Sequence, residues 1–210
     1  MTGTRNRWKL MSTARAEKPP EQGKRRKLDD YETPPHEGLQ LARFFKPSGN
    51  ILEPACGSGR LVGALKEAFP GVRITGTDIK TGHDYTKRTK TWAGDIITNP
   101  PYRDGLADFF TTKSLELADG KVAMLLQSGF MWGSGRCDSL HLVTPPELII
   151  VLPYRVYFFE GPKGKPIKSQ YFNHAWYCWP DRAARERGDY GTRVEWAPKI
   201  ADNDDENDFG

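Results

Sequence analysis

The segment Thr98 to Tyr102, with the sequence Thr-Asn-Pro-Pro-Tyr, contains the residues best suited to chemistry. It follows the apolar run Asp95-Ile96-Ile97, which is typical of a short buried strand. The prolines end that strand and stiffen the backbone behind it. The Asn99 amide, the backbone carbonyls and the Tyr102 ring are then held at the carboxyl end of a strand. This combination suits the binding of a flat group that carries an amine.

A second segment, Leu52 to Gly59, has the sequence Leu-Glu-Pro-Ala-Cys-Gly-Ser-Gly and is predicted to join a strand to a helix. Its glycines let the backbone approach a ligand closely, and the helix N-terminus offers free amides. A Gly-x-Gly turn alone is weak evidence, because many strand-to-helix turns need glycine. Glu53 makes the signal more specific, since a carboxylate there would repel a pyrophosphate and attract the ammonium group of an amino acid. The segment therefore favours S-adenosylmethionine over a dinucleotide.

Two acidic positions further along could complete such a cofactor site. Asp78 ends a strand predicted at 72–78, about twenty residues after the glycine turn, which is the spacing at which an acid meets ribose hydroxyls. The alternative is a strand-end aspartate that caps a helix or a turn. Asp84 could accept a hydrogen bond from an adenine amino group, with Tyr85 against the ring. Alternatively, that pair lies in an ordinary surface loop.

The elements that would position these residues alternate between strands and helices. Apolar runs predict strands near 50–53, 72–78, 95–97, 121–127, 147–152 and 174–179. Thr33 suits the N-cap and Pro34 the first residue of one helix, and 106–117 has the apolar spacing of another. Residues 128–136 are expected to form a mobile loop with aromatic side chains. The order predicts an α/β fold that ends in an antiparallel hairpin.

The composition is that of one folded domain. The chain has 210 residues, 37% of them hydrophobic and 28% charged, which is enough for a core but leaves little for a second domain. We expect a cytoplasmic protein without a membrane span or secretion signal, because no apolar run is long enough and the N-terminus is basic and polar. The widely spaced cysteines suggest neither a disulfide framework nor a zinc site.

Charge is distributed unevenly along the chain. Residues 201–210 carry five acids and no Lys or Arg, so the net charge of +4 becomes +9 when they are set aside. A basic body suits a polyanionic partner such as a nucleic acid, although a merely solvated surface would explain the charge equally well. We divide the chain into a flexible basic arm (1–29), a catalytic domain (30–198) and an acidic tail (199–210).

Taken in order, these motifs resemble those of the S-adenosylmethionine-dependent DNA adenine-N6 methyltransferases, in the gamma-class order found in restriction–modification systems. The matching segments are Tyr31–Pro35, Leu52–Gly59, Asp78, Asp84–Tyr85 and Asn99–Tyr102. The resemblance extends over residues 30 to about 180. It implies a Rossmann-like class I methyltransferase fold, with a mostly parallel seven-stranded sheet and an antiparallel C-terminal hairpin.

The resemblance also implies roles for individual residues. Thr33 and Glu53 would hold the carboxylate and ammonium ends of the methionine part of S-adenosylmethionine. The full set of cofactor-binding residues would be Thr33, Glu53, Ala55, Cys56, Gly57, Gly59, Asp78, Ile79, Asp84 and Tyr85. The catalytic residues would be Asn99, Pro100, Pro101 and Tyr102, without a metal. A base in a duplex must be flipped out to reach them, which costs a few kcal/mol.

Contacts to DNA are expected from the last hairpin and its basic loop. The candidates for an aromatic clamp on the flipped base are Phe159, Tyr171 and Phe172, which would otherwise simply pack the sheet. The candidates for phosphate contacts are Lys163, Lys165 and Lys168, which would add affinity rather than specificity. Restriction–modification members usually carry a separate target-recognition domain, which we do not expect in a chain of 210 residues. We therefore expect short or relaxed sequence specificity, in a monomer or weak dimer.

Two other functions remain open at this point. The same Asn-Pro-Pro-Tyr motif serves enzymes that methylate RNA bases or a glutamine amide in protein. The Thr33 segment and the basic loops favour a nucleic acid over a peptide amide but do not separate DNA from RNA. A non-catalytic nucleic-acid-binding module is a further alternative, against which the combination of Glu53, Asp78, Asn99 and Tyr102 argues.

Overall fold

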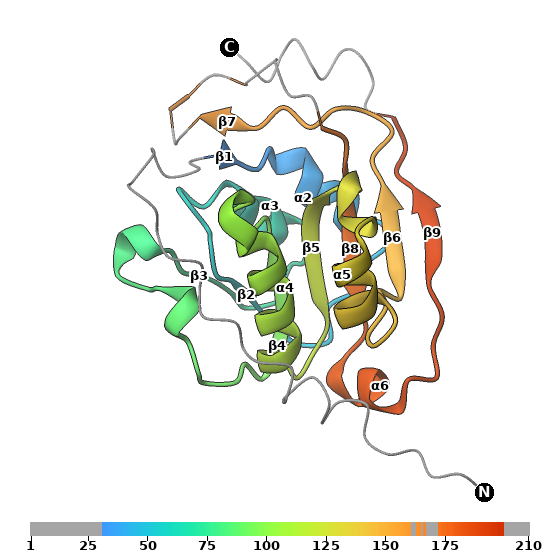
Figure 1. Ribbon diagram of the computed structural model, residues 1–210. Coiled ribbons are helices and arrows are strands. Elements are labelled where there is room, and N and C mark those ends of the chain that lie inside the picture. The colour runs from blue at the N-terminus through green and yellow to red at the C-terminus, as the bar shows by residue number, and fades with distance from the viewer. Residues whose placement is uncertain (1–30, 161–162, 165, 167–171, 200–210) are drawn as a thin grey trace, which may run out of the picture.

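The computed structural model describes residues 31–160, 163–164, 166 and 172–199 (Figure 1). The predicted basic arm and most of the predicted acidic tail lie outside the described residues. So do three of the proposed nucleic-acid contacts, Lys165, Lys168 and Tyr171.

A seven-stranded sheet forms the centre of the molecule, in the order β3-β2-β4-β5-β8-β6-β9 (Figure 1). The strands are β3 (Ile74–Gly76), β2 (Asn50–Glu53), β4 (Gly94–Thr98), β5 (Val122–Gln127), β8 (His174–Trp179), β6 (Leu148–Val151) and β9 (Arg193–Trp196). Strand β8 runs antiparallel to both of its neighbours, and the other described pairings in this sheet are parallel. The predicted mixed α/β fold with a reversed strand near its C-terminal end is confirmed. Strand β9, which continues the sheet in parallel beside β6, was not predicted.

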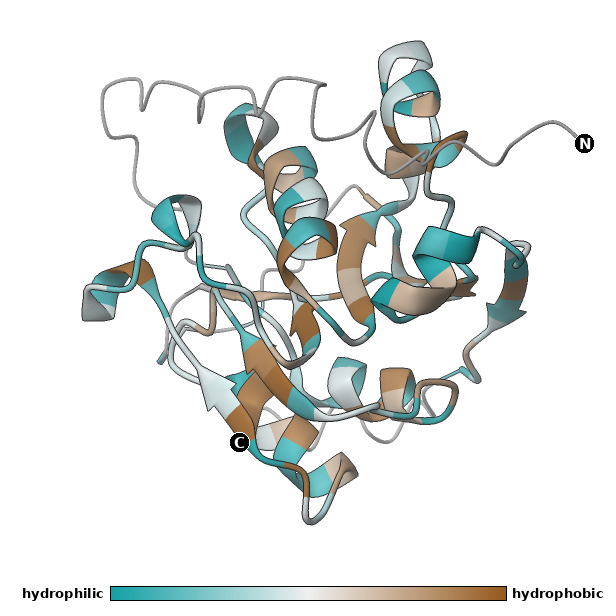
Figure 2. Cartoon of the chain, turned by 90° about the horizontal axis from the view of Figure 1, so that it is seen from below, coloured by the Kyte–Doolittle hydropathy of each residue, from teal (hydrophilic) through white to brown (hydrophobic). Residues whose placement is uncertain are grey.

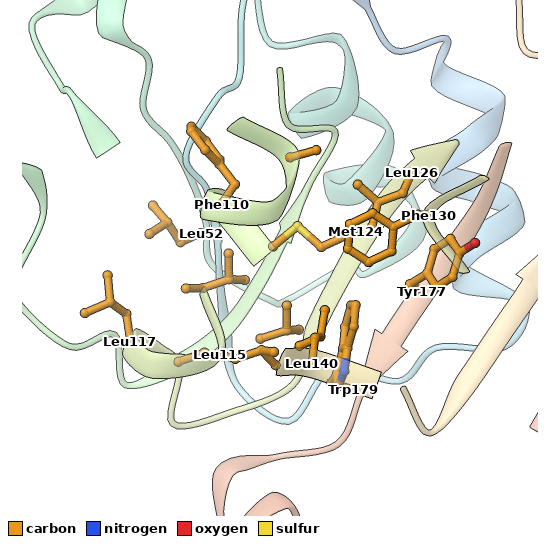
Figure 3. Packing of buried hydrophobic residues seen from close by; sticks show 14 of the residues in the cluster. Leu52, Phe110, Leu115, Leu117, Met124, Leu126, Phe130, Leu140, Tyr177 and Trp179 are labelled. Atoms are coloured by element: carbon orange, nitrogen blue, oxygen red, sulfur yellow. The ribbon is translucent and has the colours of Figure 1, made fainter. Parts of the chain in front are cut away.

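Helices cover both faces of the sheet. Helices α2 (Pro35–Ala42) and α3 (Arg60–Ala68) contact one face, and α4 (Leu106–Leu117) contacts the other. Alternate residues of β5 pack against the helices on opposite faces of the sheet. Met124 and Leu126 face the α4 side, and Ala123 and Leu125 face the α2–α3 side. The strands at the centre are accordingly mostly apolar in Figure 2, and the α4-side core is drawn in Figure 3.

Helix α2 begins one residue later than predicted. Pro34, not Thr33, occupies the N-cap, with φ −58° and ψ 141°, and it makes no side-chain capping bond. The cause is local, because Pro35 disfavours helical ψ at the residue before it. Thr33 is consequently buried in the extended entry to the helix rather than capping it.

The segment after β5 also differs from expectation. Instead of an irregular loop it forms three short helical elements, η4 (Ser128–Met131), α5 (Ser134–Arg136) and the π-helical turn η5 (Cys137–His141). Other short elements are η1 (Ile79–Thr81), η2 (Tyr85–Lys87), η3 (Arg103–Gly105) and α6 (Arg182–Arg187). Within the described part of the chain, no helix is both long and apolar enough to cross a membrane.

The carboxyl ends of the parallel strands meet at one edge of the sheet. Strand β8 starts at that edge, since His174 pairs with Gln127, the last residue of β5. A small antiparallel ribbon of β1 (Tyr31–Glu32) and β7 (Phe159–Glu160) lies on the side to which the arrowheads of β6 and β9 point in Figure 1. Glu53 ends β2, Asp78 lies two residues after β3, and Asn99 follows β4, so the fold brings these three residues to the same edge.

Candidate active site

Glu53, the last residue of β2, is a buried carboxylate with one oxygen left over. Its Oε1 accepts hydrogen bonds from the Ala55 amide at 2.9 Å and from the Thr98 hydroxyl at 2.5 Å. Its Oε2 is buried and has no hydrogen-bond partner among the described residues. Burial raises the pKa of Glu53 to about 8. A buried oxygen of this kind requires a proton or a cation beside it, which is what the ammonium group of an amino acid would supply.

The Thr98 hydroxyl joins the two parts of the candidate site. Thr98 is the fully buried last residue of β4, and the residue that follows it is Asn99. Its hydroxyl donates to Glu53 across the pairing of β2 with β4. The Glu53 carboxylate, which suits a cofactor, is therefore hydrogen-bonded to the residue that immediately precedes Asn99. Sequence analysis did not assign Thr98 a role, because a threonine that ends a strand has no distinctive pattern.

Asp78 organises the glycine turn. Its two carboxylate oxygens accept from the backbone amides of Gly57 and Lys80, each at 2.9 Å. Asp78 therefore caps η1, as the alternative interpretation of the sequence held, and also fixes the turn 21 residues earlier in the chain. Gly57 and Gly59 have φ values of 53° and 97°, which disfavour any other residue. A Cβ at Gly59 would meet nothing within 4 Å, so the turn has open space beside it.

Glu32 is a functional candidate that lies in the Tyr31–Pro35 motif but to which sequence analysis assigned no role. Its carboxylate accepts from the Ser58 amide at 3.0 Å, from the Ser58 hydroxyl, and from Arg60 Nε at 3.0 Å. The Arg60 guanidinium in turn lies 4.1 Å from the centroid of the Phe159 ring. These contacts fasten the β1–β7 ribbon to the glycine turn. No local pattern could reveal them, because the partners are 26 and 28 residues apart.

The Asn99–Tyr102 segment is held by the tyrosine hydroxyl. Tyr102 Oη lies 2.5 Å from Asn99 Oδ1 and 3.0 Å from the Leu125 carbonyl, so its one proton is shared between two acceptors. The Tyr102 ring lies 6.5 Å from the ring of Phe158 and 5.7 Å from that of His174, centroid to centroid. The amide oxygen of Asn99 is thereby turned towards Tyr102, and the ring is supported from behind.

His174 supports Tyr102 as a neutral side chain. It is 2% exposed, its Nδ1 has no hydrogen-bond partner among the described residues, and its ring lies 5.0 Å from that of Phe158. Burial lowers the pKa of His174 to about 4. The rings of Phe158 and His174 form the aromatic backing of Tyr102. The neighbouring Phe159, a candidate clamp on the flipped base, faces Arg60, and its role remains a prediction.

The remaining predicted residues fall into separate environments. The Tyr85 hydroxyl lies 2.8 Å from Ser114 Oγ, and its ring packs against Phe110 in the core. Asp84 accepts from Thr86 and pairs with Lys87 Nζ at 3.2 Å. The predicted residues that lie exposed or half-exposed at the surface are Ala55, Cys56, Ile79, Lys163 and Phe172. Roles for all of these side chains remain predictions.

A cavity of about 250 Å³ lies beside Tyr102, on the α4 side. It is lined by Tyr102, Ala107, Asp108, Leu126, Gln127, Gly129, Phe130 and Arg136. Phe130 and Leu126 also belong to the core cluster shown in Figure 3. Within the described ranges, no group of three or more His, Cys, Asp or Glu side chains is arranged to hold a metal ion.

Comparison with known proteins adds to this geometry. No protein-family model matches the chain. A ribosomal RNA small subunit methyltransferase C from Shewanella pealeana is 33% identical over a match that covers 33% of this chain and 26% of that protein. A solved structure from Vibrio vulnificus YJ016, assigned as a modification subunit of a type I restriction enzyme, superposes with a TM-score of 0.52 at 13% identity, covering 81% of this chain and 48% of that one.

The fold is that of a Rossmann-like methyltransferase. A second solved structure, a protein from Pyrococcus horikoshii assigned as an RNA methyltransferase, has a TM-score of 0.46 at 16% identity and covers 82% of this chain and 95% of that one. The chain spans about a quarter of the curated relative and about half of the modification subunit. The superposition with the modification subunit supports the fold alone, at 13% identity.

Proposed function

We propose that this protein transfers a methyl group from S-adenosylmethionine to the exocyclic N6 of adenine in DNA, with short or relaxed sequence specificity. The observation that carries the proposal is the Thr98 hydroxyl bond to Glu53. It links a buried carboxylate, one of whose oxygens has no hydrogen-bond partner among the described residues, to the residue before an Asn-Pro-Pro-Tyr segment. One part suits an amino acid ammonium group and the other suits a flat amine.

The residues present fit the cofactor. Glu53 Oε2, without a partner among the described residues, would accept from the ammonium group, and the glycine turn held by Asp78, open at Gly59, would allow close approach of the rest of the molecule. S-adenosylmethionine, when bound, supplies a methyl group already activated by the positive sulfonium. The protein therefore needs neither a metal nor a covalent intermediate, and its own contribution is binding and orientation.

Asn99 and Pro100 would act on the base. The exocyclic amine of adenine is a poor nucleophile, because its lone pair is delocalised into the ring. Asn99 Oδ1 and the Pro100 carbonyl would accept its two hydrogens and favour a nitrogen with a localised lone pair. Asn99 Oδ1 retains acceptor capacity beside the Tyr102 hydroxyl, since an amide oxygen has two lone pairs. The Tyr102 ring provides the surface on which the base would stack.

RNA is the second candidate substrate. The name of the curated relative, a ribosomal RNA methyltransferase, favours it. The chemistry at Asn99 would be the same for an exocyclic amine in either nucleic acid. Only the shape and flexibility of the polymer would differ, because an RNA target is usually unpaired whereas a duplex base must be extruded.

The test is methyl transfer from labelled S-adenosylmethionine to duplex DNA, folded RNA and protein, followed by identification of the modified nucleoside by mass spectrometry. We expect N6-methyladenine in DNA. In Asn99→Ala we expect a fall in kcat of about 10² or more, as for loss of a group that contacts the reacting atoms, with the Kd for S-adenosylmethionine unchanged. Label found only in RNA or only in protein, or full activity of Asn99→Ala, would contradict the proposal.

A further inference from the structure

The cavity beside Tyr102 has walls suited to a flat, uncharged ligand. Aromatic rings from Tyr102 and Phe130 and the apolar side chain of Leu126 line it. Its volume of about 250 Å³ lies just below the roughly 300–1,000 Å³ typical of pockets for drug-sized ligands. A single ring system, such as a nucleobase, matches this size.

The two charged side chains in the wall, Arg136 and Asp108, form an ion pair with each other. Arg136 donates to both carboxylate oxygens of Asp108, through Nε at 2.5 Å and Nη2 at 3.0 Å. Its Nη1 donates to the carbonyls of Phe130 at 3.1 Å and Trp132 at 2.7 Å, and its guanidinium lies 4.4 Å from the Phe130 ring centroid. This pair therefore holds the 128–136 segment against α4 and leaves no net charge to attract an ionic ligand.

Gln127 is the polar side chain in this wall that remains free. It ends β5, its backbone pairs with His174, and the residue is half-buried and lines the cavity. The described residues provide no hydrogen-bond partner for its side-chain amide, which makes no capping bond although Gln127 occupies the N-cap of η4. Where the described residues leave its donor and acceptor unused, an amide on a residue that lines a small hollow with an aromatic wall can bind the edge of a base directionally.

We propose that this cavity receives the target base and that the Gln127 side-chain amide donates to a ring nitrogen beside the exocyclic amine, N1 or N7 in adenine. The inference rests on the proposed function, because it assigns a base to the same site. Gln127 is then a specificity-determining residue: Asn99 and Pro100 engage the amine, which several bases possess, and Gln127 tests the ring position next to it.

The experiment compares wild-type protein with Gln127→Leu on duplex oligonucleotides that carry adenine, 1-deazaadenine or 7-deazaadenine at an adenine already mapped as methylated. With adenine, we expect kcat/KM to fall about tenfold in Gln127→Leu, as for one lost hydrogen bond to a desolvated group. With the analogue that lacks the contacted nitrogen, wild type and variant should have equal kcat/KM, since the contact is absent from both. The matched control is Ser128→Ala, an exposed neighbour outside the cavity wall.

The outcomes separate the two proposals. If wild-type protein does not methylate adenine in DNA, the proposed function fails, and the assignment of Gln127 to an adenine ring nitrogen is overturned with it. If it does, and Gln127→Leu keeps its kcat/KM within twofold or loses the same factor on all three bases, the role of Gln127 is overturned. The Kd for S-adenosylmethionine and the melting temperature, measured for each variant, show whether the fold and the cofactor site are intact.

Discussion

The two halves of the candidate site are built from different interactions. On the β2–β3 side, three carboxylates, from Glu32, Glu53 and Asp78, bind backbone amides and hydroxyls and fix the glycine turn. On the β5–β8 side, Tyr102 is backed by uncharged rings, and the Gln127 amide is unused. A fixed array of hydrogen-bond acceptors suits a cofactor, which is the same in every reaction. Packed rings with an amide that makes no bond to the described residues suit a substrate that has to be distinguished from similar molecules. Variants that disturb one half alone can test this division.

The largest effect is expected from Glu53→Gln. The substitution keeps the shape but removes the charge, and so the Kd for S-adenosylmethionine should rise roughly hundredfold, as for a charge-assisted hydrogen bond. Isothermal titration calorimetry measures this directly. Glu37→Gln is the matched control, since Glu37 is another fully buried glutamate whose pKa is raised by burial, located on α2. Equal loss of affinity in both variants would mean that Glu53 acts only through stability.

A smaller effect, confined to the other half, is expected from Tyr102→Phe. Loss of the hydroxyl frees Asn99 Oδ1 to rotate, so kcat should fall about tenfold while the Kd for S-adenosylmethionine stays within twofold. Tyr177→Phe removes a comparable hydroxyl, which donates to the Ser128 carbonyl at 3.2 Å, and should leave kcat nearly unchanged. If single-turnover rates of the two variants were the same, the Tyr102–Asn99 contact would have no role in the reaction.

The stability of the free protein should depend on pH through Glu53. The pKa of Glu53 is raised from 4.5 to about 8, so the folded state holds its proton more tightly than the unfolded state does. The contribution of Glu53 to the free energy of unfolding is therefore complete below pH 4.5 and is lost as the pH rises through about 8. The melting temperature of Glu53→Gln should exceed that of wild type by an amount that grows as the pH rises through this range. Each kcal/mol of difference in stability corresponds to about 2–4 °C. A constant difference in melting temperature would contradict the assignment.

The opposite pH dependence is expected from His174. Burial lowers the pKa of His174 from 6.5 to about 4, so its contribution is present above pH 6.5 and is lost as the pH falls through about 4. His174→Phe keeps a ring beside Tyr102 and Phe158 but cannot take up a proton. Its melting temperature relative to wild type should rise as the pH is lowered over this range, and differential scanning calorimetry at a series of pH values would detect it.

Sequence reasoning succeeded where the signal was local. The apolar runs that predicted β4 and β5, and the apolar spacing that predicted α4, lie within single elements. It failed for β9, an edge strand whose Arg193, Val194 and Trp196 are exposed, because such a strand has no apolar run. It also failed for 128–136, whose glycines suggested a loop, because the turns depend on Arg136 reaching Asp108 on α4.

The same limit applies to the candidate site. Glu53, Asp78, Asn99 and Tyr102 follow strand ends and could be placed from the sequence. The contacts of Glu32 with Ser58 and of His174 with Tyr102 join distant segments, which a single sequence does not connect. The burial that shifts the pKa values of Glu53 and His174 is likewise a property of the assembled core.

The Thr98 hydroxyl has a consequence for the order of events in a catalytic cycle. This hydroxyl donates to Glu53, and burial disfavours the negative charge of Glu53 in the free protein. An arriving ammonium group would restore that charge. A charged acceptor holds that hydroxyl more firmly than a neutral one, and the next residue in the chain is Asn99. For the proposed methyl transfer, we therefore expect the substrate to meet a more rigid amide after the cofactor has bound, and the two to bind in a fixed order rather than a random one.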